Sequence, residues 1–133
     1  MKKMVKRALA LGICVMLILS SVVFVSAASA TFFTKTIGSH RCTGRGTVSS
    51  TQGQGIFNAT ALPGQPILPD EAYDCFVWVN AYDSSGKLFG GEYETGHTSL
   101  VVTYKPSSGK IIDHISCSFE FEGEKLGPYN LYK

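Results

Sequence analysis

Beyond residue 30 the chain alternates between apolar and polar residues and lacks the spacing of an amphipathic helix. No segment there repeats apolar residues at i, i+3, i+4 and i+7 over helical length, and glycine, serine and threonine recur throughout. Short alternating runs bounded by turn residues are typical of β-strands. We expect strands near residues 32–37, 40–50, 55–62, 73–83, 87–95, 98–105 and 110–122, with a short last piece at 129–132.

This strand spacing predicts an all-β domain, a small antiparallel β-sandwich of about seven strands. The immunoglobulin-like and jelly-roll-like arrangements both fit, and a sandwich fits better than a barrel. Residues 83–87 and 106–110 share the run Ser-Ser-Gly-Lys, which predicts a β-hairpin with a left-handed glycine at each place. The proline-rich stretch 63–69 is expected to cross between the two sheets, with a peptide-binding polyproline II turn as the alternative.

The first thirty residues have the three parts of a secretory signal peptide. Four basic residues precede an uncharged apolar stretch from Ala8 to Val25, which closes on small residues. We expect a signal peptide at 1–30, cleaved after Ala27 or Ala30, and a single all-β domain at 31–133. The apolar stretch approaches the length of a membrane span, so an uncleaved anchor is the alternative. Cleavage predicts a secreted, extracellular or cell-surface protein without stable membrane insertion.

Removing the signal peptide reverses the net charge. Four of the twelve basic residues lie in it, whereas all ten acidic residues lie beyond it. The remaining part has eight basic and ten acidic residues, a net charge of −2, and its basic residues are scattered. Nucleic acid and anionic membranes require a clustered basic face, so neither is an expected partner.

Three cysteines lie in the predicted domain, and thiols tend to pair outside the cytosol. Cys42, Cys75 and Cys117 permit one disulfide in three alternative pairings. The remaining thiol is expected either to be buried or to link two chains as a homodimer. His40, His97 and His114 lack metal-ligand spacing, so no metal or cofactor is expected.

The hairpin around residues 83–87 predicts a candidate binding face. If Asp83 lies opposite Lys87, one side of the hairpin carries aromatic rings beside amide and carboxylate groups, and the other side belongs to the core. Rings can cover the apolar face of a sugar while polar side chains bond its hydroxyls. The alternatives are that the rings only cover the sheet, or that the register is shifted by one residue. The expected pairs on the binding face are Tyr82–Leu88, Asn80–Gly90, Trp78–Glu92 and Phe76–Glu94.

Carboxylates also alternate along the last long predicted strand. Glu120, Glu122 and Glu124 lie opposite apolar positions and are expected to form a solvated strand face. A small hydrolase with paired carboxylates, Glu92 with Glu94 or Glu120 with Glu122, is an alternative. No serine nucleophile motif occurs, and we expect no catalytic residues.

The general plan of the chain carries a resemblance. The Met-Lys-Lys start, the run Cys42-Thr43-Gly44-Arg45-Gly46-Thr47-Val48-Ser49-Ser50 and the turn Tyr82-Asp83-Ser84-Ser85-Gly86-Lys87 resemble small secreted β-proteins of Gram-positive bacteria. Among these, the lactococcin 972 type of bacteriocin is a small exported β-sandwich that acts at the cell wall. The predicted domain is longer and has three cysteines, and no functional residue is transferred.

These observations together predict a non-enzymatic binding protein of the bacterial cell envelope. Its expected partner is a cell-wall glycan or an envelope protein. A bacteriocin-like secreted toxin is the alternative that the resemblance implies, and a small secreted hydrolase is the third.

Overall fold

The structure is a computed structural model that describes residues 27–133, and no α-helix occurs in this part of the chain. The predicted signal peptide therefore lies outside the described residues, except for its last four. A short 3-10 helix, η1, covers Asp70–Ala72. The eight strands are β1 (Ala27–Ile37), β2 (His40–Ser49), β3 (Gln52–Ala61), β4 (Cys75–Tyr82), β5 (Leu88–Gly96), β6 (Ser99–Tyr104), β7 (His114–Phe121) and β8 (Glu124–Tyr132).

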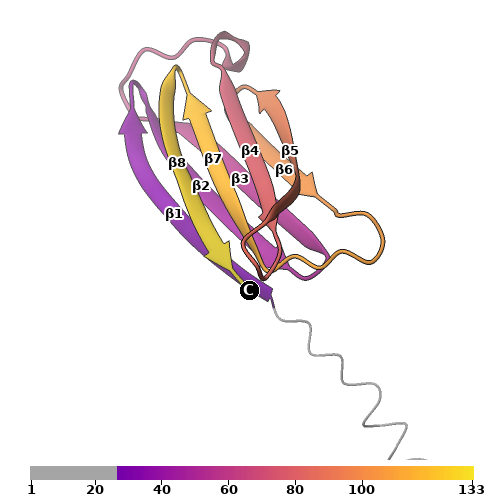
Figure 1. Cartoon of the computed structure of the whole chain (residues 1–133). Helices are drawn as coiled ribbons and strands as arrows, with labels where there is room; N and C mark the ends of the chain where they lie inside the picture. Colours follow the sequence, from indigo (N-terminus) through magenta and orange to yellow (C-terminus); the bar gives the residue numbers. More distant parts are fainter. Residues whose placement is uncertain (1–26) are drawn as a thin grey trace, which may run out of the picture.

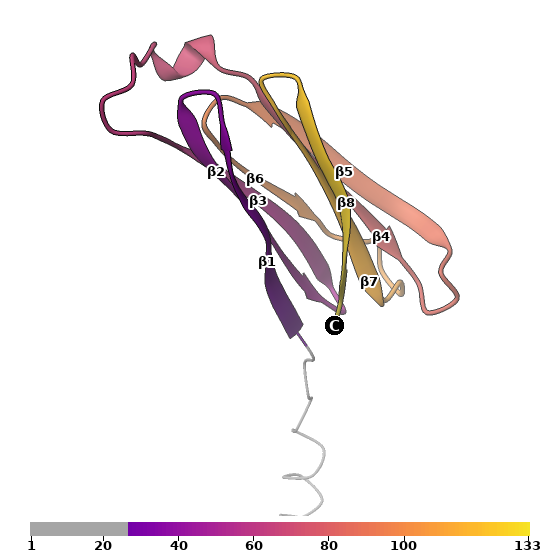
Figure 2. The same ribbon diagram turned by 90° about the vertical axis from the view of Figure 1, so that its left-hand side faces the viewer.

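The strands form two antiparallel four-stranded sheets that lie face to face as two layers (Figure 2). Sheet A has the order β1-β2-β3-β6, and sheet B has the order β5-β4-β7-β8. The segment between β3 and β4, which contains η1, passes over one end of the two layers (Figure 1). The predictions of an antiparallel sandwich and of a crossover in this segment are confirmed.

The two Ser-Ser-Gly-Lys turns have different roles. Gly86 and Gly109 both adopt the expected positive φ, 79° and 85°, and the first turn joins the paired strands β4 and β5. The second turn is not a hairpin, because β6 pairs with β3 in sheet A while β7 pairs with β4 in sheet B. A turn sequence specifies local backbone geometry, whereas burial decides which strand becomes the partner.

The end of the chain forms a hairpin that the sequence interpretation missed. Glu122 and Gly123 have φ values of 51° and 80°, and Phe121 pairs with Glu124 across them. Positive φ at both central residues is typical of a tight two-residue hairpin turn. The predicted strand face of Glu120, Glu122 and Glu124 is therefore wrong, because the chain reverses between the first and the last of them.

The core combines large side chains from sheet B with glycines on the inner face of sheet A. A Cβ added to Gly53 would lie 2.7 Å from Cγ2 of Ile115, and one on Gly55 would lie 2.8 Å from Cγ1 of Val77. Only glycine leaves room for the two sheets at this separation, because carbon atoms normally stay about 3.5–4.0 Å apart. In the same layer, Gly44 and Gly46 make room for the rings of Phe33 and Phe32 of β1.

Candidate functional site

Strand β4 divides its side chains between the core and the outer face of sheet B. Its odd-numbered residues, from Cys75 to Ala81, are fully buried, and its even-numbered residues are half-buried. These are the two faces expected from the alternation. The even-numbered residues on the outer side are Phe76, Trp78, Asn80 and Tyr82.

The register of β5 differs from the prediction because the strand contains a β-bulge. Tyr82 pairs with Leu88 as expected, but Ala81 already pairs with Gly90. Phe89 is therefore an extra residue in β5. A bulge of one residue moves the rest of a strand to the opposite face.

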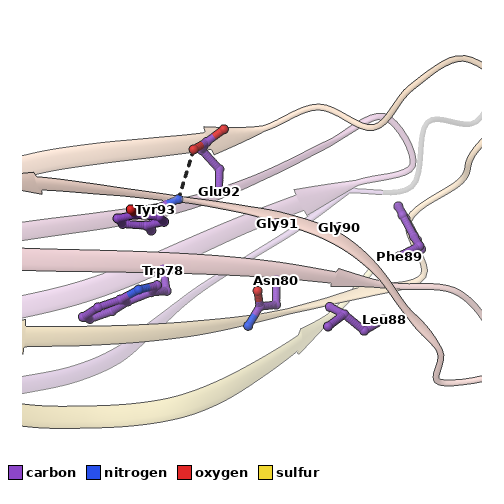
Figure 3. Close-up of a pocket in the computed structure, with 8 residues that line it drawn as sticks. All are labelled: Trp78, Asn80, Leu88, Phe89, Gly90, Gly91, Glu92 and Tyr93. Carbon is purple, nitrogen blue, oxygen red and sulfur yellow. Dashed lines mark hydrogen bonds between the residues drawn. The ribbon is translucent and has the colours of Figure 1, made fainter.

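The bulge changes which residues of β5 join the aromatic face. Trp78 pairs with Tyr93 and not with Glu92. Glu92 and Glu94 are instead opposite the buried β4 valines, so their predicted place beside the rings is wrong. Both glutamates are exposed, since β5 is the edge strand. Figure 3 shows the Glu92 carboxylate pointing away from Trp78, where it accepts a hydrogen bond from the Tyr93 backbone N–H at 3.2 Å.

Two further strands extend this outer face. Trp78 pairs with Ser118 of β7, and Asn80 pairs with Ser116, which in turn pairs with Asn130 of β8. Tyr82 is linked in the same way to His114 and Tyr132. The sequence interpretation missed the β7 and β8 residues because their positions depend on long-range pairing. The Glu122-Gly123 turn was the signal that could have located β8.

The rings on this face form two separate clusters. In the Trp78 cluster (Phe76, Trp78 and Tyr93), the rings of Phe76 and Trp78 stack at 5.7 Å between centroids and 15° between planes. In the His114 cluster (Tyr82, His114 and Tyr132), the imidazole lies between two tyrosine rings, 4.8 Å from one and 4.4 Å from the other. The Asp113 carboxylate contacts Nδ1 of His114 at 2.9 Å.

The Trp78 side chain borders two hollows. One has a volume of about 410 Å³ and extends over Asn80 and residues 88–93 of β5 (Figure 3). A Cβ on Gly91 would lie 2.6 Å from Oδ1 of Asn80, so a larger residue would crowd this space. The other hollow, of about 240 Å³, lies toward β7 and β8 and includes Ser118 and Gly127. Trp78 thus borders open space both toward β5 and toward β7 and β8.

The outer face of sheet A contrasts with that of sheet B. Its strands pair polar side chains with one another, as where Gln54 bonds Thr47 at 3.1 Å and Thr103 at 2.9 Å. The hollow on this side, of about 300 Å³, is bordered by Arg45 and has no aromatic residue in its lining. The six rings on the outer side of sheet B are therefore a property of one face and not of the whole surface.

The carboxylate pairs considered for a hydrolase do not converge on a cavity. Glu92 borders the 410 Å³ hollow beside Trp78 but Glu94 does not, and both pair with buried β4 valines. Glu120 lies between Phe76 and Lys125 on neighbouring strands. The Glu122 carboxylate accepts a hydrogen bond from the Asp74 backbone N–H at 2.7 Å, so it fastens two loops together.

The three cysteines of residues 27–133 are free and fully buried, and no disulfide is present among them. They come from β2, β4 and β7 and lie in the core. Burial raises the pKa of Cys117 to about 12 and those of Cys42 and Cys75 to about 11. The expected bridge is absent from the described part of the chain.

The three histidines lie in different surroundings. The buried ring of His40 packs edge-on against Tyr73, and Nδ1 of His97 contacts the Tyr73 carbonyl oxygen at 2.9 Å. His114 belongs to the outer face of sheet B. Within residues 27–133, no three His, Cys, Asp or Glu side chains gather in a way that could hold a metal ion.

Comparison of the chain with protein-family models, curated proteins and solved structures finds no match. None of the described elements is a helix long and apolar enough to cross a bilayer. The chemistry of the outer face of sheet B is therefore the basis for a functional assignment.

Proposed function

We propose that the protein is exported to the cell envelope and binds a glycan through the outer face of sheet B. The observation that carries this proposal is the asymmetry of the two outer faces, one with six rings and the other with mainly hydroxyl, amide and arginine side chains. Aromatic rings on one exposed face offer apolar contact area at a low entropic cost. A non-enzymatic role is supported by the separation of the carboxylates.

The polar groups between the rings suit a sugar better than a purely apolar partner. Asn80, Ser118 and Asn130 are uncharged and lie between or beside the two aromatic clusters, whereas the nearby Ser116 is buried. Amides and hydroxyls can both donate and accept hydrogen bonds, as sugar hydroxyls require. Glu92 and Glu94, which were first assigned to this face, are not part of the proposed site.

The order of the strands supports an immunoglobulin-like sandwich over a jelly roll. Without β1, the sheets have the orders β2-β3-β6 and β5-β4-β7-β8. These correspond to strands A-B-E and C′-C-F-G of the immunoglobulin-like arrangement. On this assignment β1 is an added edge strand, and the proposed site covers the C′-C-F-G sheet.

Co-sedimentation with purified Gram-positive cell wall tests the proposal. We expect the protein to pellet with the wall, and Trp78→Ala and Tyr93→Ala to weaken retention by about tenfold or more, as for buried aromatic contacts at other interfaces. Tyr93 is 62% exposed, so its truncation spares the core. Val101→Ala, at an exposed position of sheet A, is the matched control. Equal retention of the parent protein and all variants, or no retention of the parent protein at all, would overturn the proposal.

A further inference from the structure

We propose that the ligand is an extended, uncharged oligosaccharide of at least three sugar units that contacts both aromatic clusters at once. This inference rests on the proposed function and adds the length and charge of the ligand. It follows from the distance between the two clusters, from the groups between them and from the position of the charges.

The two clusters are further apart than one sugar ring can span. Trp78 and Tyr82 belong to different clusters and are four residues apart on β4. At about 3.3 Å per residue, their Cα atoms are separated by about 13 Å. A single pyranose ring covers about one aromatic ring, so a ligand that stacks on both clusters has at least one further unit between its two stacked units.

A row of polar side chains fills the space between the clusters. Asn80 and Asn130 lie on either side of Ser116, which is only 5% exposed, in a row across β4, β7 and β8. No hydrogen bond within residues 27–133 engages either amide side chain, so both are free to bond a ligand. A middle sugar unit that turns its hydroxyl edge to the sheet fits this row, because amides can donate to and accept from hydroxyl groups.

On β4, β7 and β8, charged groups lie at the two ends of the face and not in the row between the clusters. Glu120 and Lys125 form one row with Phe76, at the outer end of the Trp78 cluster. Asp113 lies beside His114 at the other end. A charged sugar in the middle would lose water without gaining an ion pair, so the arrangement favours an uncharged chain.

Affinity as a function of chain length tests the inference. We would titrate the purified protein calorimetrically with β-1,4-linked N-acetylglucosamine oligomers of one to six units, and with the matching glucose oligomers. We expect affinity to rise by about tenfold or more between two and four units of the series that binds, since the second cluster is then engaged, and to level off beyond that length.

Two exposed tyrosines separate the contributions of the clusters. Tyr132 is 59% exposed and belongs to the His114 cluster. We expect Tyr132→Ala to bind four units no better than the parent protein binds two, while Tyr93→Ala weakens every length. Val101→Ala should leave the length dependence unchanged.

The outcomes distinguish the two proposals. Binding with the same affinity from one unit upward, or a Tyr132→Ala variant with the parent's length dependence, would overturn the extended ligand and leave the glycan site intact. If neither series binds at any length while the protein still pellets with the cell wall, the uncharged-oligosaccharide inference fails alone. If the protein also fails to pellet, the proposed function fails with it.

Discussion

Replacing Gly55 with alanine probes the close approach of the two sheets. The new Cβ would lie 2.8 Å from Cγ1 of Val77 and 3.0 Å from Cγ2 of Val79. Both distances are at least 0.5 Å shorter than an ordinary carbon contact of about 3.5 Å. Both valines are fully buried in the core, so neither can move out toward solvent.

The expected change in the free energy of unfolding is the difference between two opposing effects. Overpacking a core by a methyl group costs about 1–3 kcal/mol. Replacing glycine in a strand recovers about 0.5–1 kcal/mol, because alanine loses less backbone freedom on folding. The difference is about 0–2.5 kcal/mol, and because the new methyl group meets two side chains at once, we expect Gly55→Ala to lower the free energy of unfolding by about 1–2 kcal/mol.

A double-mutant cycle isolates the cause. Val77→Ala alone should destabilise the protein by about 2–3 kcal/mol, through lost burial and the cavity that remains. It also removes the Cγ1 atom that the new methyl group meets. Gly55→Ala in the Val77→Ala background should therefore cost at least about 1 kcal/mol less than in the parent protein.

Urea denaturation provides the assay. The fluorescence of Trp78, the single tryptophan, and circular dichroism can report unfolding, and an unchanged m-value would indicate that the midpoint reflects stability. Thr60→Ala, at an exposed outer position of the same strand, is the control. A Gly55→Ala variant as stable as the parent protein, or a cycle that is additive within about 0.3–0.5 kcal/mol, would refute the close contact as the cause.

Three further predictions concern the thiols, the first strand and a turn. The three buried thiols should resist alkylation at pH 8 until urea is added, and fast labelling of the native protein would contradict this. Because these thiols stay neutral in the folded protein while unfolded thiols ionise near pH 9, the free energy of unfolding should fall as the pH rises above about 9. A chain that begins at Thr31 lacks the β1–β2 pairs of residues 28–30, so it should be about 1–3 kcal/mol less stable than one that begins at Ala28. Equal urea midpoints for the two chains would count against a structural role for these pairs. Asp83 accepts hydrogen bonds from Ser85 and from the Lys87 backbone N–H, which hold its pKa below the usual range. The contribution of the Asp83 carboxylate to stability should therefore be present at neutral pH and lost as the pH falls through that lowered pKa. If NMR shows Asp83 titrating at the usual pKa of an aspartate, the turn does not hold the carboxylate.

The sequence by itself determined the fold class and the two faces of individual strands. In β4, apolar residues at every second position place Val77 and Val79 in the core and Trp78 on the outer side, because side chains alternate strictly along a strand. The left-handed conformation of Gly86 and Gly109 was also predictable, since both follow the same turn sequence. These features depend on neighbours within a few residues.

Tertiary structure alone decided which strands became partners and in what register. Because of the bulge at Phe89, Tyr93 and not the expected Glu92 lies beside Trp78, although the turn before the bulge has the expected conformation. Pairing of β7 with β4 and of β8 with β7 brought His114 and Tyr132 to Tyr82. Alternation fixes the side of a strand on which a residue lies but not the residue opposite it. That neighbour is set by the packing of whole sheets, where the inner glycines of sheet A and the large side chains of sheet B must fit together.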